Sequence, residues 1–169
     1  MSFRFVVLPA LLAIVAPAWA QDADDAPAPA ATPAVWTMAT GDAWLDTWLT
    51  DINTYAGRYR GAFIDELVRY QGAPRAFVTE LLDAGGRPAD VYLACAAAQA
   101  IGRPCRDVVG EWRFDPAGGW AEVLARLEAG PDTAPFARVR QGVVSSFDRW
   151  ARPITLDAAL RRALPDREG

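Results

Sequence analysis

Residues 89–112 read ADVYLACAAAQAIGRPCRDVVGEW, and this stretch decides the fold. Its first half predicts a helix from about Ala89 to Ile101, which Gly102 ends because glycine is favoured just after a helix C-terminus. Pro104 then predicts the start of a second helix, since proline is tolerated in a first helical turn. The stretch therefore predicts a helical hairpin with a very short turn.

Outside this hairpin, apolar residues also recur at helical spacing, and no stretch alternates convincingly as a strand. Glycine and proline interrupt the pattern often, for example at Gly85-Gly86 and at Gly130-Pro131. The long helices of a four-helix bundle would need fewer breaks. The sequence therefore predicts an all-α fold, an irregular orthogonal bundle of about seven or eight short helices.

The first of these helices follows a capping residue, either Thr40 or Asp42. We expect Gly57 and Gly61 to divide it from a second helix, and residues 156–164 to form a last short one. The apolar face of the first helix consists of Trp44, Leu45, Trp48, Leu49 and Ile52.

Histidine and lysine are both absent, and all 17 basic residues are arginine. Without histidine the chain lacks the commonest general base and the commonest transition-metal ligand. Without lysine it can form neither a Schiff base nor a P-loop phosphate contact. We therefore predict no enzymatic activity, no metal and no other cofactor. The net charge of -4 lacks the basic excess of nucleic-acid binders, so no nucleic acid is expected as a partner.

Residues 1–20, MSFRFVVLPALLAIVAPAWA, have the three regions of a secretory signal peptide. Arg4 supplies the positive charge, residues 5–15 the short apolar core, and residues 18–20 the small-x-small cleavage site. We predict cleavage after Ala20, which leaves no membrane anchor and a periplasmic or secreted protein.

Residues 21–34, QDADDAPAPAATPA, are rich in Ala, Pro and Asp. Such a segment cannot bury enough apolar surface to order itself, so it predicts a disordered linker. Residues 35–169 then form a single helical domain.

Cys95 and Cys105 are the only cysteines, and an exported protein meets an oxidising compartment. If the turn centres near residues 102–103, the antiparallel partner of Cys105 lies nearer Ala100 than Cys95. The offset is roughly 7.5 Å along the helix, whereas a bridge needs Cα atoms within about 7 Å. We predict a bridge, formed through a steep helix crossing or an early end of the first helix. The alternative is two small buried apolar residues.

Residues 90–150 contain three segments that belong together: DVYLACAAAQAIGRPCRDVVGEW, GGWAEVLARL and PFARVR. They resemble a family of small, secreted, uncharacterised helical proteins of gamma-proteobacteria. In that family a helix begins at an Asp-Val-Tyr-like step, a Gly-Arg/Lys-Pro turn follows, and Gly-Trp precedes a later helix. The turn after that helix is Ala129-Gly130-Pro131 here, whereas the family usually has a glycine-initiated turn. The resemblance implies a helical, exported, periplasmic protein, and it implies no catalytic residue.

Trp112, Arg113 and Trp120 flank a loop at residues 115–119. Exposed tryptophan and arginine beside a flexible loop are typical of interaction hot spots, although small helical domains also bury such tryptophans. We predict an interaction surface here for an envelope protein. The function we expect is therefore a non-enzymatic binding or accessory module outside the cytoplasm.

The alternative function is a carboxylate-based cell-wall glycan hydrolase, because two carboxylates can cleave a glycosidic bond without histidine. The spacing singles out no pair among the acids of the predicted helices. The candidates are Asp65, Glu66, Glu80, Glu111 and Glu122.

Overall fold

A computed structural model describes residues 38–167, which form eight helices and no strand. This confirms the predicted all-α bundle of short helices. The predicted signal peptide (1–20) and linker (21–34) lie outside the described residues. The helices are α1 (Ala43–Arg58), α2 (Arg60–Tyr70), α3 (Arg75–Asp83), α4 (Pro88–Ile101), α5 (Cys105–Phe114), α6 (Gly119–Arg126), α7 (Ala134–Arg149) and α8 (Ala158–Ala163).

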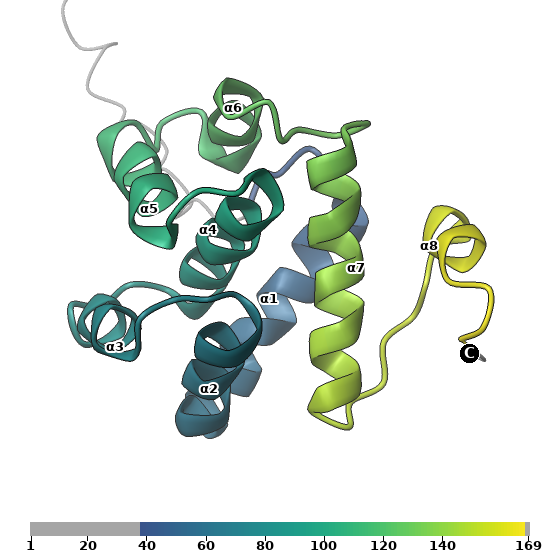
Figure 1. The fold of residues 1–169 in the computed structure, drawn as a ribbon, viewed down its shortest axis with the longest axis horizontal. Coiled ribbons are helices and arrows are strands. Elements are labelled where there is room, and N and C mark those ends of the chain that lie inside the picture. Colours follow the sequence, from purple (N-terminus) through teal and green to yellow (C-terminus); the bar gives the residue numbers. More distant parts are fainter. Residues whose placement is uncertain (1–37, 168–169) are drawn as a thin grey trace, which may run out of the picture. The chain divides into compact units, whose positions relative to one another are not determined.

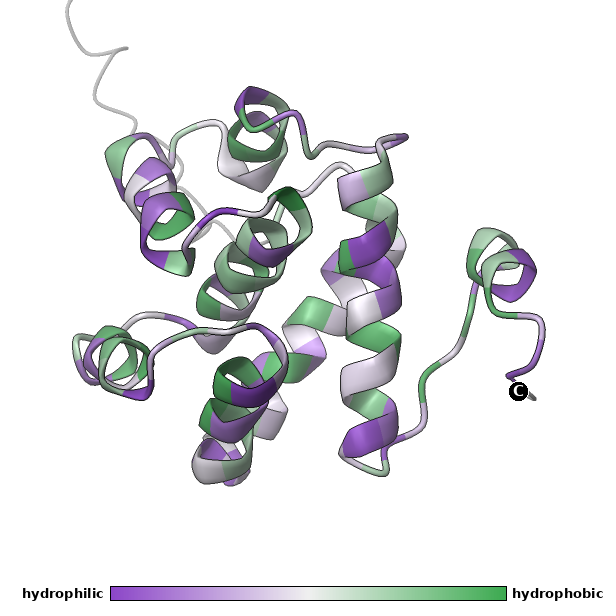
Figure 2. Ribbon diagram, in the orientation of Figure 1, coloured by the Kyte–Doolittle hydropathy of each residue, from purple (hydrophilic) through white to green (hydrophobic). Residues whose placement is uncertain are grey.

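Helix α4 is the helix around which the others pack (Figure 1). Helices α1, α3, α5 and α7 all contact it, and nine of its 14 residues are buried. Figure 2 shows hydrophobic colouring along most of its length. Its run of alanines presents little side-chain volume, which lets neighbouring helices approach it closely. No helix of the described part of the chain is both long and apolar enough to cross a membrane.

The start of α1 is capped by Asp42, whose carboxylate accepts a hydrogen bond from the Leu45 N–H at 2.7 Å. Thr40, the other predicted cap, instead donates its hydroxyl to the Asp46 carboxylate at 2.6 Å. The boundary between α1 and α2 falls at Tyr59.

Gly57 and Gly61, which we expected to divide the two helices, therefore lie inside α1 and α2 on either side of the boundary. A glycine costs a helix only about 1 kcal/mol relative to alanine, so packing can keep it helical.

The turn between α4 and α5 brings Cys95 and Cys105 together as a disulfide, with their Cα atoms 4.4 Å apart. Helix α4 does not end early; Gly102 ends it with a φ of 71°, in the left-handed region. Seven helical residues from Cys95 to Gly102 rise about 10 Å. Three extended residues from Gly102 to Cys105 return about the same distance, because extended backbone covers about 3.3 Å per residue. The offset between the two cysteines that we predicted from the sequence assumed a helical rise on both sides of the turn, and it was therefore too large.

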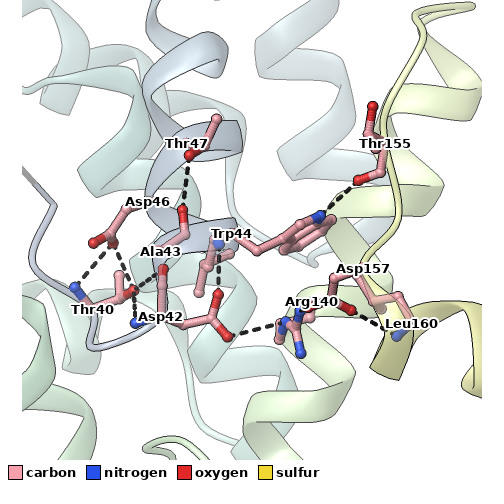
Figure 3. Close-up of polar contacts among 11 residues, drawn as sticks. Thr40, Asp42, Ala43, Trp44, Asp46, Thr47, Arg140, Thr155, Asp157 and Leu160 are labelled. Carbon is pink, nitrogen blue, oxygen red and sulfur yellow. Dashed lines mark hydrogen bonds and ion pairs between the residues drawn. The ribbon is translucent and has the colours of Figure 1, made fainter.

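Helix α8 lies on the outer side of α7 and is attached there by a cluster around Arg140 (Figures 1 and 3). The Arg140 guanidinium forms ion pairs with Asp42, 3.4 Å away, and with Asp157, the N-cap of α8. It also lies over the Trp44 ring, whose indole N–H donates to the Thr155 carbonyl at 2.7 Å. One arginine of α7 thus joins the first turn of α1 to the first turn of α8. The small apolar cluster beneath α8 consists of Val144, Leu156 and Leu160.

Candidate functional site

Trp120, part of the predicted interaction surface, is fully buried. Its ring stacks on Trp112, with centroids 4.6 Å apart and planes 7° from parallel. Its indole N–H donates to the Asp90 carboxylate of α4 at 2.8 Å. Burial raises the pKa of Asp90, and the Trp120 hydrogen bond and the Arg87 charge offset only part of that rise. Trp120 therefore joins α6 to the core and is not available to a partner, contrary to our expectation.

The Gly118-Gly119 pair before this tryptophan lies where the backbone needs residues without side chains. Gly119 has a φ of 69°, and a Cβ there would lie 2.9 Å from the Ala39 Cβ. This close approach lets the Ala39 carbonyl accept a hydrogen bond from Ala121 at 2.7 Å in the first turn of α6. The Gly-Gly-Trp motif therefore docks the chain before α1 onto the start of α6.

The exposed aromatic residue of this segment is Phe114, which is 89% exposed. Arg113, the third predicted surface residue, is exposed beside it, and Trp112 is partly buried. The helical stripe of α5 runs through Cys105, Val108 and Trp112, and Phe114 falls outside it. That periodicity is the sequence signal that identifies Phe114 as the exposed ring.

A buried polar network joins α2, α4 and α7. Ser146, almost fully buried, donates its hydroxyl to the Glu66 carboxylate at 2.6 Å and lies 2.7 Å from the Tyr92 hydroxyl. Arg149 binds the same carboxylate through Nε, at 3.1 and 3.0 Å to its two oxygens, and through Nη2. The guanidinium also stacks over the Tyr70 ring, 3.8 Å from its centroid. The network thus compensates the charge of Glu66, which is only 3% exposed.

Tyr92 is held neutral within this network. Burial strongly raises the pKa of its hydroxyl, and the nearby Glu66 charge raises it further. The Ser146 hydrogen bond, the Arg149 charge and a hydrogen bond with the Gln71 side chain act in the opposite direction without reversing the shift. Tyr92 is therefore a structural hydroxyl of the core.

A pocket of about 260 Å³ opens next to the network, between the end of α2, one side of α4 and one face of α7. Four residues of α7 spaced i, i+4, i+7 and i+11 form one wall, with an arginine at each end: Arg138, Gly142, Ser145 and Arg149. The opposite side consists of Tyr70, Gln71, Ala96, Gln99 and Ala100, and Val139 and Ser146 complete the lining. No aspartate or glutamate lines this pocket.

Two polar side chains of this lining differ from the rest: Gln71 has an amide oxygen without a hydrogen-bond donor, and Arg138 has no ion-pair partner among residues 38–167. The Gln71 side chain is 9% exposed, and its Oε1 is buried without a hydrogen-bond donor. That oxygen is itself almost inaccessible, so it belongs to the core beneath the lining and does not face the open part of the pocket. Arg138 donates one N–H to the Ala100 carbonyl at 2.7 Å, and no ion pair joins it to a carboxylate of residues 38–167. Neither Gln71 nor Arg138 was among the site residues predicted from the sequence, because nothing local marks them as more than polar positions.

The five candidate acids of a glycan hydrolase come from four helices and do not meet in the pocket. Asp65 is ion-paired with Arg75, and Glu66 is bound by Arg149. The Glu122 carboxyl packs against Gly118, where a Cβ would come within 1.8 Å of it. Glu80 and Glu111 lie on α3 and α5. Among residues 38–167, no group of three or more His, Cys, Asp or Glu side chains could hold a metal ion.

Comparisons with protein families, with curated proteins and with solved structures gave no significant match to this chain. The similarity of residues 90–150 to small exported helical proteins therefore stays a prediction from the sequence.

Proposed function

We propose that this chain is an exported, non-enzymatic binding module that holds a small polar ligand in the pocket between α2, α4 and α7. The observation that carries the proposal is the lining of that pocket, which combines two arginines with glutamine and serine side chains and contains no carboxylate. Ligand pockets are typically concave and contain a few convergent polar groups, which is the composition of this lining.

The walls of the pocket are rigid, which favours binding without a large ordering cost. Nine of the 14 residues of α4 are buried, and α7 is fixed on its inner side by the Glu66–Arg149 contact and on its outer side by Arg140. The lining offers arginine, glutamine and serine side chains, which bind and orient. It contains no pair of carboxylates for acid–base chemistry, so binding fits the site better than hydrolysis does.

Export is part of the proposal and has two supports. The first is the signal-peptide pattern of residues 1–20. The second is the disulfide between Cys95 and Cys105, since disulfides persist in the periplasm and outside the cell and are rare in the cytosol. An envelope protein as partner stays a prediction, and Arg113 and Phe114 are the exposed residues of the predicted segment that could contact it.

The proposal is tested by filling the pocket. A Cβ added at Gly142 meets no atom within 4 Å, so Gly142→Leu places a side chain in the pocket wall without a backbone clash. Gly110→Leu on α5 is the matched control, because its Cβ also meets nothing within 4 Å and it lies outside the pocket. Both changes replace a helical glycine, so both should leave the fold intact or stabilise it by about 0.5–1 kcal/mol.

Saturation-transfer NMR with a set of sugars, polyols, amino acids and small carboxylates measures binding to the wild type and to both variants. We expect at least one compound to bind the wild type and Gly110→Leu but not Gly142→Leu. If no compound distinguishes the two variants, the pocket is not a binding site. Clearing in a peptidoglycan zymogram would instead favour the predicted glycan hydrolase.

A further inference from the structure

The C-terminal segment, residues 153–167, packs on the bundle through a small apolar cluster of its own. That cluster consists of Val144, Leu156 and Leu160, whereas the large core lies around α4. Residues 152–157, which connect α7 to α8, have no regular secondary structure. Helix α8 has six residues, and an isolated helix needs roughly 12–15 to be stable in water. The C-terminal segment is therefore folded only while it is docked on the bundle.

The surface beneath this segment is a row of side chains on the outer face of α7. Arg140, Val144 and Asp148 follow one another at i, i+4 and i+8, so they lie along one face over about 12 Å. We call these three residues the outer row. In this order they present a positive charge, an apolar side chain and a negative charge. None of them lines the pocket between α2, α4 and α7.

The C-terminal segment matches the outer row in charge and in hydropathy. Asp157 forms an ion pair with Arg140, and Arg167 forms one with Asp148. Leu156 and Leu160 pack with Val144, the apolar position of the row, and Leu164 packs against the same cluster. The segment therefore shows directly which side chains this surface binds.

The surface is held in place independently of the segment that covers it. Asp42 contacts Arg140 from the start of α1 at 3.4 Å, and the guanidinium lies 4.9 Å from the centroid of the Trp44 ring (Figure 3). Trp44 also packs against the large core. Departure of the segment would release the Trp44 indole N–H from the Thr155 carbonyl and uncover Val144, while the large core stayed closed.

A second copy of the chain is a poor competitor for this surface. Its C-terminal segment would make the same contacts as the attached one and would also pay the free-energy cost of association. A competitor must therefore offer more than residues 153–167 do. Pro165 prevents α8 from continuing, because proline cannot extend a helix. A longer helix with the same side chains would lose less order-dependent free energy on docking.

We propose that the outer row, together with Trp44, binds an amphipathic helix of a partner protein, and that the C-terminal segment occupies this surface as an intramolecular competitor. The partner helix begins at an acid, as α8 does at Asp157, and carries leucines three and seven residues later. It is longer than α8.

Fluorescence anisotropy of a labelled peptide added to the full chain tests the proposal. The peptide has the sequence of residues 153–167 with Pro165→Ala, which lets its helix continue. In the chain, Leu156→Ala with Leu160→Ala weakens the attached segment and leaves the outer row unchanged. We expect the peptide to bind this double variant at least tenfold more tightly than the wild type, because an occupied surface lowers the apparent affinity by the fraction of chains that are open.

Two further changes in the double variant locate the binding site. Arg140→Met should weaken peptide binding at least tenfold, whereas Arg126→Met, which removes a positive charge on α6, should not change it. Equal affinity of the wild type and the double variant would overturn the proposal, and so would equal effects of the two arginine changes. Equal or tighter binding of the peptide with its original Pro165 would show that the partner helix is not longer than α8.

The remaining outcomes concern the fold and the identity of the occupant. If Leu156→Ala with Leu160→Ala abolishes cooperative unfolding, α8 is an indispensable part of the core and the proposal is wrong. If the wild-type chain forms dimers that Arg140→Met abolishes, the occupant is a second copy and not a partner protein. Light scattering of the wild type and of Arg140→Met measures this.

Discussion

Replacing both cysteines by alanine should destabilise the domain by an amount that follows from the chain length between them. Cys95 and Cys105 are separated by 10 residues. In the chain-entropy description, a bridge closing a loop of that length removes about 9 cal/mol/K from the unfolded chain, which is about 2.7 kcal/mol at 25 °C. We therefore expect Cys95→Ala with Cys105→Ala to lower the free energy of unfolding by about 3 kcal/mol, since two buried sulfur atoms are also lost.

Urea unfolding followed by tryptophan fluorescence measures this loss directly. In thermal unfolding, a domain of about 130 residues has an unfolding entropy near 0.27 kcal/mol/K, so the same loss lowers Tm by about 10 °C. The reduced wild type is the control, because it loses the bridge but keeps both sulfur atoms in the core.

A loss below about 1 kcal/mol in both proteins would refute the reasoning. It would mean that the turn at Gly102 already holds the two cysteines near each other in the unfolded chain, so that the bridge removes little entropy. A large loss in the double variant with none in the reduced wild type would instead assign the effect to packing around the sulfur atoms.

The other predictions concern the two ionic clusters. Arg140→Met unpairs Asp42 and Asp157, so it should lower the free energy of unfolding by about 1–2 kcal/mol and speed tryptic cleavage within α8. Slower or unchanged cleavage would argue against Arg140 as the residue that attaches α8. Burial alone would raise the pKa of Asp157, but its bonds from the Leu160 N–H and Arg140 together lower it. Its stabilising contribution is therefore present above its unfolded pKa and lost as the pH falls through the folded value, so Asp157→Asn should lose its effect in acid. Burial raises the pKa of Asp90, so its charge costs stability at neutral pH and that cost disappears as the pH falls below its unfolded value. Asp90→Asn, which keeps an acceptor for Trp120, should be at least as stable as the wild type at pH 7 and lose any advantage near pH 4; a less stable variant at pH 7 would contradict this.

Local sequence rules were enough to predict the helices. Gly102 and the segment 156–164 predicted the end of α4 and the presence of α8, because capping and periodicity act over one or two turns. The prediction of a disulfide depended on the two cysteines and on the expected oxidising compartment, whereas the assumed helix geometry argued against it. Where two residues could serve the same local purpose, as with Thr40 and Asp42, the sequence left the choice open and a side-chain contact with Asp46 decided it.

The candidate site could not be predicted in this way, because its parts come from helices that are distant in the sequence. Gln99 and Arg138 are ordinary polar positions on their own helices, and Gln71 directly follows α2; only the packing of these helices places the three residues around one pocket. Trp120 shows the same limit in reverse. Its neighbours in the chain suggested an exposed residue, but contacts with Trp112 and with Asp90, 30 residues away, bury it. Helical spacing determines which face of a helix is apolar, whereas tertiary packing alone determines which polar groups on the other face meet.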